Sequence, residues 1–136
     1  ADMGAGSGIL GAAALLLGAR HSDFFEKDAP AVESCKETVE LNRLEKKSGV
    51  YQMDLLREYE GFARNKNYDM ALINIIAEVI VDLLDLPAVQ RIPLIYLTGI
   101  IEEKKVMVEE KIKEAGFVIE AEDLLENWVF YKIKKA

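Results

Sequence analysis

The feature that most constrains how this chain can fold is a glycine-rich stretch at residues 2–10, which runs directly into an apolar, alanine-rich segment. Three glycines at alternate positions, Gly4, Gly6 and Gly8, let the backbone turn tightly and bring its N–H groups close to a ligand. The apolar segment predicts a helix over residues 7–17, whose positive N-terminal end would face that ligand. This pattern is typical of a nucleotide-binding loop, but it does not identify the nucleotide.

Beyond this loop, strand-like and helix-like segments alternate. The hydrophobic pattern predicts strands over 21–26, 50–53, 68–73 and 92–97, and helices over 30–42, 75–84 and 102–114. The polar residues 57–67 predict a loop with a helical turn. Two final strands, over 117–122 and 127–133, have no helix between them. Alternation followed by a terminal hairpin predicts an α/β fold with a mostly parallel sheet and an antiparallel strand at its end.

The same periodicity predicts which helix residues face the core. In the first helix, one face carries apolar side chains: Ile9, Leu10, Ala13, Ala14 and Leu17. The helix over 75–84 presents another apolar face: Ile75, Ile76, Val79, Ile80, Leu83 and Leu84.

Length and composition limit the classes of function that the chain can have. With 136 residues the chain is long enough for one domain with a hydrophobic core, which we place over residues 1–136. Its net charge of −7, without a basic stripe, argues against nucleic-acid binding, and no apolar run has membrane-spanning length. The single cysteine, Cys35, excludes an internal disulfide, fits a reducing cytoplasmic compartment and is expected to be buried. His21 has no second histidine or cysteine near it, so no metal site is expected.

Polar residues follow three of the predicted strands, at Glu26, Asp54 and Asn74. Ligands of parallel sheets bind at the carboxyl ends of the strands, so these residues and the glycine loop are predicted to converge on one site. Glu26, about 20 residues after the glycines, is placed to accept hydrogen bonds from ribose hydroxyls, and Asp54 to reach an adenine edge. Each acid also has a plain alternative, because acids often end strands simply to meet water.

Two classes of nucleoside cofactor compete for this arrangement. Residues 6–11 match the dinucleotide pattern G-x-G-x-x-G, with Glu26 at a suitable distance. However, Asp2 stands two residues before Gly4, which shifts the turn upstream of where a pyrophosphate loop requires it. The C-terminal hairpin is also not the ending of a two-half dinucleotide fold. Both features favour S-adenosylmethionine, whose cationic sulfonium requires carboxylates and backbone carbonyls.

Several segments resemble, in order, the motifs of the ribosomal protein L11 methyltransferases. Residues 2–10 look like the first motif of that family, and residues 26–33 are similar to the second. Residues 53–56 resemble its adenine-proximal segment, and Asn-Ile-Ile-Ala at 74–77 is close to the family's Asn-Ile-Leu-Ala signature. The match continues through three further segments: residues 97–103, 115–117 and 128–129. The resemblance covers essentially the whole chain.

This resemblance implies a Rossmann-like class I methyltransferase fold, S-adenosylmethionine as cofactor, and methyl transfer to amino groups of a basic protein, ribosomal protein L11. It implies that the cofactor is bound by Asp2, Gly4, Ala5, Gly6, Ser7, Gly8, Glu26, Lys27, Asp54, Leu55 and Asn74. Asn74 is also expected to orient the incoming amine. The alternative for Asn74 is that it only caps the helix that follows. No general base is identified.

The sequence departs from the family pattern in three ways. The family's N-terminal substrate-recruiting domain is expected to be absent, and because only Ala1 precedes Asp2, the central strand of the sheet is expected to be truncated. Glu26 and Ala29 stand where the family usually has Asp and Pro, and the connection over residues 86–93 is short. A second hypothesis is therefore a non-catalytic cofactor-binding module of the same fold. A nicotinamide-dependent oxidoreductase is the third.

Overall fold

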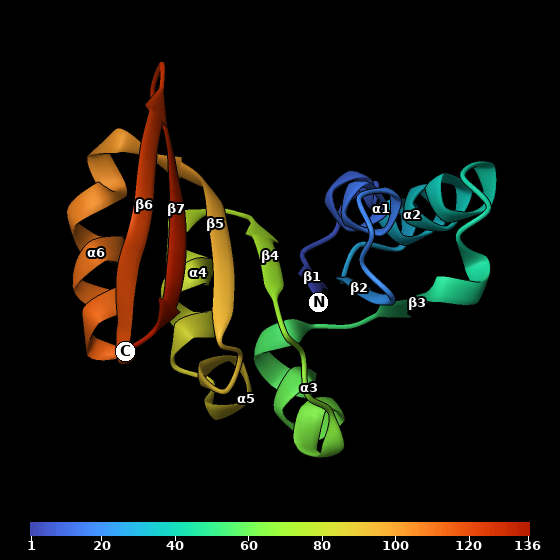
Figure 1. The fold of residues 1–136 in the computed structure, drawn as a ribbon, viewed down its shortest axis with the longest axis horizontal. Coiled ribbons are helices and arrows are strands. Elements are labelled where there is room, and N and C mark those ends of the chain that lie inside the picture. The colour runs from blue at the N-terminus through green and yellow to red at the C-terminus, as the bar shows by residue number, and fades with distance from the viewer.

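In a computed structural model that describes residues 1–136, the chain forms one seven-stranded sheet with helices on both faces (Figure 1). The strands are β1 (Asp2–Met3), β2 (Ser22–Glu26), β3 (Ser48–Gln52), β4 (Ala71–Asn74), β5 (Leu94–Ile101), β6 (Phe117–Leu125) and β7 (Trp128–Lys135). The α-helices are α1 (Ile9–Leu16), α2 (Ala29–Leu41), α3 (Leu55–Phe62), α4 (Ala77–Leu84), α5 (Pro87–Gln90) and α6 (Lys105–Glu114). Short 3-10 turns lie at Glu45–Lys47, Ala63–Asn65 and Glu102–Lys104.

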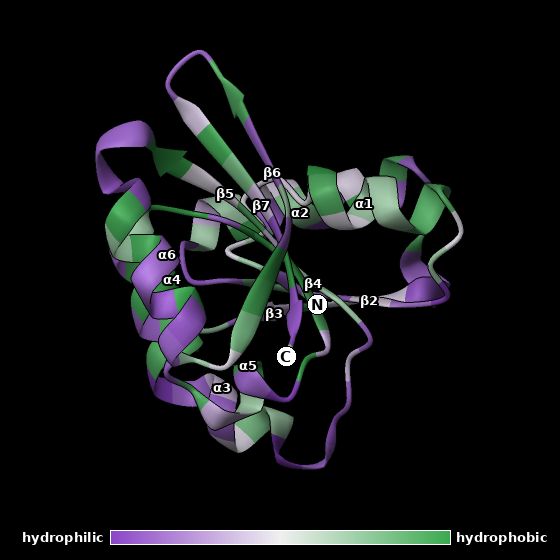
Figure 2. Ribbon diagram, turned by 60° about the vertical axis from the view of Figure 1, so that its left-hand side comes forward, coloured by the Kyte–Doolittle hydropathy of each residue, from purple (hydrophilic) through white to green (hydrophobic).

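The strand order across the sheet is β3-β2-β1-β4-β5-β7-β6. Six strands run in the same direction, and β7 alone runs opposite to them. This arrangement confirms the predicted mostly parallel sheet with a C-terminal antiparallel hairpin. The helices divide between the two faces, with α1 and α2 on one and α3 to α6 on the other (Figure 2). None of these helices is both long and apolar enough to cross a membrane.

The central strand β1 consists of only two residues but pairs on both sides. Asp2 lies opposite Phe24 of β2 and opposite Leu72 of β4. The Ala1 amino group donates to the Met70 carbonyl at 2.9 Å, and the Met3 side chain is fully buried. These contacts fix the start of the glycine loop at the middle of the sheet.

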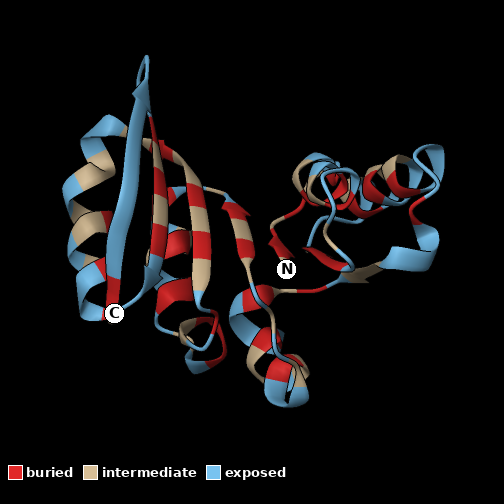
Figure 3. Cartoon of the chain, viewed as in Figure 1, coloured by how far each residue is buried: buried red, intermediate tan, exposed pale blue.

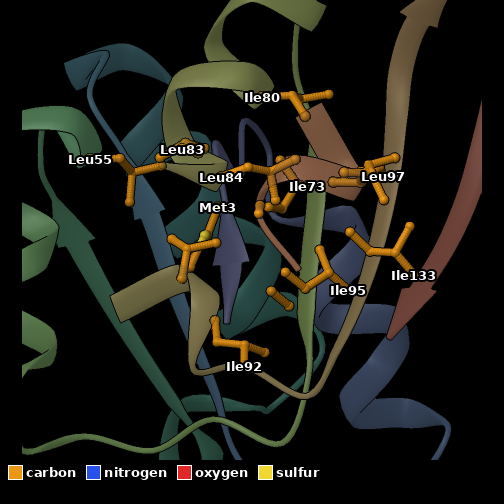
Figure 4. Packing of buried hydrophobic residues seen from close by; sticks show 14 of the residues in the cluster. Met3, Leu55, Ile73, Ile80, Leu83, Leu84, Ile92, Ile95, Leu97 and Ile133 are labelled. Carbon is orange, nitrogen blue, oxygen red and sulfur yellow. The ribbon is translucent and has the colours of Figure 1, made fainter. Parts of the chain in front are cut away.

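The apolar core is divided by the sheet into two unequal parts. The larger cluster contains 25 buried residues and fills the space between the sheet and α3 to α6 (Figure 4). The smaller one contains 7 residues and lies under α1 and α2. The inner faces of β4, β5 and β7 are buried, whereas the edge strand β6 is exposed beyond Phe117 (Figure 3).

The face of helix α1 that the sequence pattern predicts to be buried is instead largely exposed to solvent. Ile9 is 68% exposed and Leu17, at the helix end, is 89% exposed. The residues that are buried instead are Gly11, Ala12 and Leu15. A Cβ atom on Gly11 would lie 2.4 Å from the Phe24 ring, so α1 approaches β2 more closely than a larger residue would allow. Close backbone packing therefore decides the orientation of this helix.

Other features also differ from the predictions. The segment predicted as a loop over 57–67 contains α3, because Asp54 accepts a hydrogen bond from the Leu56 N–H and Glu58 accepts one from the Asp54 N–H, at 3.2 and 2.7 Å. Such reciprocal capping stabilises a helix start. Strand β5 continues past Leu97 to Ile101 through a bulge. Ile76, predicted to face inward, is 62% exposed.

Cys35 lies in the smaller cluster as a buried apolar residue, which confirms its predicted environment. Burial raises the pKa of its thiol to about 11, so the reactive thiolate is scarce at neutral pH. No group of three or more histidine, cysteine, aspartate or glutamate side chains is arranged to hold a metal ion.

Candidate functional site

The glycine loop between β1 and α1 lies between the ends of β2 and β4. The N–H groups of Gly4 and Ala5 both donate to the Phe25 carbonyl at 2.9 Å. On its other side the loop touches the residue after β4, because a Cβ atom on Gly4 would lie 2.4 Å from the Ile75 side chain. The loop, the end of β2 and the start of the β4–α4 connection therefore form one continuous rim at the carboxyl edge of the sheet.

Glu26 is held rigidly at this rim by three backbone donors. One carboxylate oxygen accepts from the Gly6 N–H at 2.8 Å, and the other accepts from the N–H groups of Lys27 at 2.8 Å and Asp28 at 3.0 Å. Two carboxylate oxygens can accept about four hydrogen bonds, so one position is left for a further donor. The carboxylate is thus oriented in advance and can still receive a ligand hydroxyl.

Asp2 forms the floor of the loop. Its carboxylate accepts the Gly11 N–H at 2.8 Å, and its side chain is almost completely buried. Helix α1 begins after Gly8, which has no side chain to serve as a cap, so Asp2 supplies the cap from β1. Burial raises the pKa of Asp2 to about 6, and the hydrogen bond from Gly11 opposes that increase.

The two carboxylates determine which ligands suit the loop. Asp2 and Glu26 each accept a hydrogen bond from the loop or the first turn of α1. The Asp2 charge beneath the loop disfavours a pyrophosphate and favours a cation, whereas the Glu26 carboxylate suits the ribose hydroxyls of either cofactor class. Gly6 has a φ of +55° and nothing within 4 Å of its Cβ position, so the loop is open to a ligand at that point.

The residues at the end of β3 have mixed roles. Asp54 caps α3 as described, and its second oxygen lies 3.9 Å from the Lys27 ammonium. Leu55 is buried in the larger core cluster, which leaves only its backbone for contact with a ligand. The Lys27 side chain is 76% exposed. Lys27 and Asp54 therefore lie beside each other at the ends of β2 and β3, and none of the three residues lines the cavity beside Asn74.

Asn74 ends β4 and is exposed at the rim, where its side-chain amide has no hydrogen-bond partner within the chain. The cap position of α4 is Ile76, so the alternative that Asn74 caps this helix is wrong. Beside the amide is an open cavity of about 450 Å³. It is lined by Asn74, Ile75, Ile76, Thr98, Gly99 and Trp128.

Of these six cavity residues, only Asn74 was predicted as a site residue. Thr98 lies beside Asn74 in the register between β4 and β5. Gly99 has a φ of +79°, and a Cβ atom there would lie 2.5 Å from the Ile75 carbonyl oxygen and 2.9 Å from the Asn74 side-chain oxygen. A glycine inside a strand signals a bulge or a close backbone approach, and that signal was available in the sequence.

A second cavity, of about 670 Å³, lies at the opposite edge of the sheet, and none of the predicted site residues lines it. Its polar wall is centred on Asp23, which accepts hydrogen bonds from the His21 ring, the Lys66 ammonium and the Tyr68 hydroxyl at 2.6–2.9 Å. Burial alone raises the pKa of Asp23, but these three donors outweigh it and hold the pKa below its usual value. This network ties β2 to the segment before β4.

Comparison with known proteins identifies similar sequences. The family model described as ribosomal protein L11 methyltransferase (PrmA) matches residues 1–136. The ribosomal protein L11 methyltransferase of Bacillus pumilus is 37% identical over 136 residues, and that of Anoxybacillus flavithermus is 38% identical. Each alignment covers 98% of this chain and 42% of the relative, so the chain spans less than half the length of these curated relatives.

Solved structures show the same fold. A ribosomal protein L11 methylase from Lactobacillus delbrueckii subsp. bulgaricus superposes with a TM-score of 0.87 at 24% identity, over 99% of this chain and 69% of that one. A protein of the NADB-Rossmann superfamily from Streptococcus agalactiae superposes with a TM-score of 0.82 at 21% identity, over 99% of this chain and 60% of that one. The sheet and its helices thus have the fold of these solved structures.

Asp2→Asn should stabilise the chain at pH 7 but not at pH 4. Folding raises the pKa of Asp2 from 3.8 to about 6, so its favourable contribution is complete below pH 3.8 and is lost as the pH rises through 6. The loss at pH 7 is about 3 kcal/mol, and asparagine can accept the Gly11 N–H without titrating. In urea unfolding from pH 4 to 7, the free-energy gap between variant and parent should widen with pH. A gap independent of pH would contradict this role for Asp2.

Gly99→Ala should displace Asn74 and destabilise the chain by about 1–3 kcal/mol, because alanine disfavours positive φ and its Cβ would collide with the Ile75 carbonyl. Urea unfolding and the NMR signals of the Asn74 side-chain amide would measure both effects. The matched control is Gly61→Ala in α3, where nothing lies within 4 Å and alanine is favoured by up to about 1 kcal/mol. Equal behaviour of the two variants would show that Gly99 does not hold Asn74 in place.

Proposed function

Because the chain belongs to the ribosomal protein L11 methyltransferase family, we propose that it is the S-adenosylmethionine-binding domain of a protein N-methyltransferase. The observation that carries the proposal is the pair of carboxylates, Asp2 and Glu26, held against the glycine loop by backbone N–H groups. Glu26 suits the ribose of either cofactor class, but a sulfonium cation suits the Asp2 charge beneath the loop, whereas the pyrophosphate of a dinucleotide does not. When bound, S-adenosylmethionine supplies an activated methyl group.

The proposed roles of the residues follow their order along the rim. Glu26 receives the ribose hydroxyls at its remaining acceptor position. Asp2 shapes the loop from below, and the loop residues Gly4, Ala5, Gly6, Ser7 and Gly8 border the cationic end of the cofactor. The adenine end lies toward β3, beside Lys27, Asp54 and the backbone of Leu55. These roles are supported by the hydrogen bonds that join the loop to β2 and by the position of Asp54 beside Lys27.

Asn74 is proposed to orient the amine that accepts the methyl group, because its amide is exposed beside a cavity and has no partner within the chain. The reaction depends on alignment of amine, methyl group and sulfur more than on an acid or a base. The amine must be neutral, which costs about 4–5 kcal/mol for a lysine with an ordinary pKa of about 10.4. The apolar cavity wall formed by Ile75 and Ile76 offsets part of this cost by disfavouring the ammonium.

We propose ribosomal protein L11 as the acceptor, because the curated relatives are named for that substrate. The net charge of −7 suits a basic partner of this kind. Residues 1–136 are proposed as one cofactor-binding domain, and a ribosomal acceptor implies a cytoplasmic location. The longer relatives suggest that substrate recruitment depends on regions outside the matched segment.

Calorimetry should detect S-adenosylmethionine binding by the chain, and Glu26→Gln should weaken it by about 10- to 100-fold through loss of a charged acceptor. The control variant Glu37→Gln alters an exposed acid on α2 and should leave the affinity unchanged. A parallel titration with NADH should give no binding. Binding of NADH in place of S-adenosylmethionine would reverse the assignment in favour of an oxidoreductase.

Asn74→Ala should reduce methyl transfer to ribosomal protein L11 by about 100-fold or more, a far larger effect than its weakening of cofactor affinity. A radiolabelled methyl-transfer assay and calorimetry would separate the two effects. Turnover that survives in the variant would remove Asn74 from the mechanism. If the parent chain binds the cofactor but transfers no methyl group, it is the non-catalytic module considered above.

A further inference from the structure

Trp128 stands at the opening of the Asn74 cavity. It is the only tryptophan of the chain, it is 53% exposed, and it lines the same cavity as Asn74, Thr98 and Gly99. Ile76, which lines the cavity as well, is 62% exposed. Two large apolar side chains thus remain uncovered beside an amide that has no partner within the chain.

The strand order places Trp128 away from the proposed cofactor. Along the carboxyl edge, Asp54 follows β3, Glu26 ends β2, the loop follows β1 and Asn74 ends β4. Trp128 begins β7, on the other side of Asn74 from Glu26 and Asp54. It is two strand spacings, about 10 Å, from β4. A side chain at this position faces whatever approaches Asn74 from the β7 side.

The backbone around Trp128 is fixed. The residue pairs with Ile101 in the antiparallel register between β5 and β7, and the neighbouring Asn127 carbonyl accepts the Glu102 N–H at 3.1 Å. The bulge between Leu97 and Ile100 lies directly beside this pair. The hairpin of β6 and β7 extends beyond the sheet at the edge where the parallel strands end (Figure 1). Trp128 is therefore presented on a rigid ribbon and not on a loose loop.

We propose that Trp128 and Ile76 are the walls of an acceptor groove that takes the aliphatic stem and amine of a lysine side chain and delivers the amine to Asn74. The inference rests on the proposed methyl transfer. The indole face attracts an ammonium as it enters, and tryptophan does so more strongly than the other aromatic residues. The methylene groups of the stem then pack between the indole and Ile76. Trp128 is a positioning residue, and Asn74 remains the group that meets the amine.

The only tryptophan makes the groove directly observable by fluorescence. The probe is Nα-acetyl-lysine N-methylamide, titrated in the presence of S-adenosylhomocysteine so that no turnover occurs. The emission of Trp128 should change with saturation, and the norleucine analogue, which has the stem without the charge, should bind at least about three-fold more weakly. An emission that does not respond to the lysine probe overturns the proposal, whether or not the chain transfers methyl groups.

Steady-state kinetics with ribosomal protein L11 gives the second test. Trp128→Ala should raise the acceptor KM by about 3- to 30-fold and leave the affinity for S-adenosylmethionine within about two-fold. Trp128→Phe, which keeps an aromatic ring, should have an acceptor KM close to that of the parent chain. The matched control is Val118→Ala, which truncates a side chain that is 42% exposed on the same hairpin but pairs with Lys134 and does not line the cavity. It should leave KM unchanged.

The outcomes separate this proposal from the assignment of the function. If calorimetry shows no S-adenosylmethionine binding to the parent chain, the proposed function fails, and the fluorescence titration still decides whether Trp128 meets an amine. If the cofactor binds and Trp128→Ala leaves the acceptor KM unchanged, the groove is refuted and the function stands. A weakened cofactor affinity in Trp128→Ala would place the indole at the cofactor and also refute the groove.

Discussion

The rest of the structure depends on the buried hydrogen bond from the Gly11 N–H to the Asp2 carboxylate, 2.8 Å long. Asp2 belongs to a strand of two residues that must occupy the centre of the sheet, and its side chain turns the chain back so that α1 begins beside that strand. Burying a carboxylate is unfavourable, as the increase of its pKa to about 6 shows. The bond repays part of that cost by capping a helix that begins with glycine.

The groups that hold the rim together are also those proposed to receive the ligand. Glu26 joins the loop to β2 through the Gly6 N–H, and Ile75 joins the loop to the β4 end through its contact with Gly4. Side chains locked in this way do not need to reorganise when a ligand arrives, which favours binding and alignment. Asn74 and Trp128 differ from them, because one has no partner within the chain and the other is half exposed.

The sequence predicts the alternation of strands and helices and the antiparallel ending, because both depend on local periodicity. It also predicts the positions of Glu26 and Asn74, because parallel strands end at the same edge of the sheet. The inward face of α1 could not be predicted, because it is decided by the Phe24 ring against Gly11, a contact between different elements. Trp128 could not be placed beside Asn74 without the register of β5 and β7, which is a long-range pairing. Helix α3 was not predicted because its sequence is polar. The reciprocal caps of Asp54 and Glu58 explain where it begins.

The central position of β1 has a consequence for the order of folding. The strand before the glycine loop pairs with β4, whose Leu72 lies 70 residues after Asp2. Closing so long a stretch of chain is slow compared with forming a helix or a hairpin. The hairpin of β6 and β7 needs only neighbouring residues, whereas the cofactor rim must wait for β2 and β4 to meet around β1. The cofactor rim is therefore among the last parts of this sheet to acquire its shape.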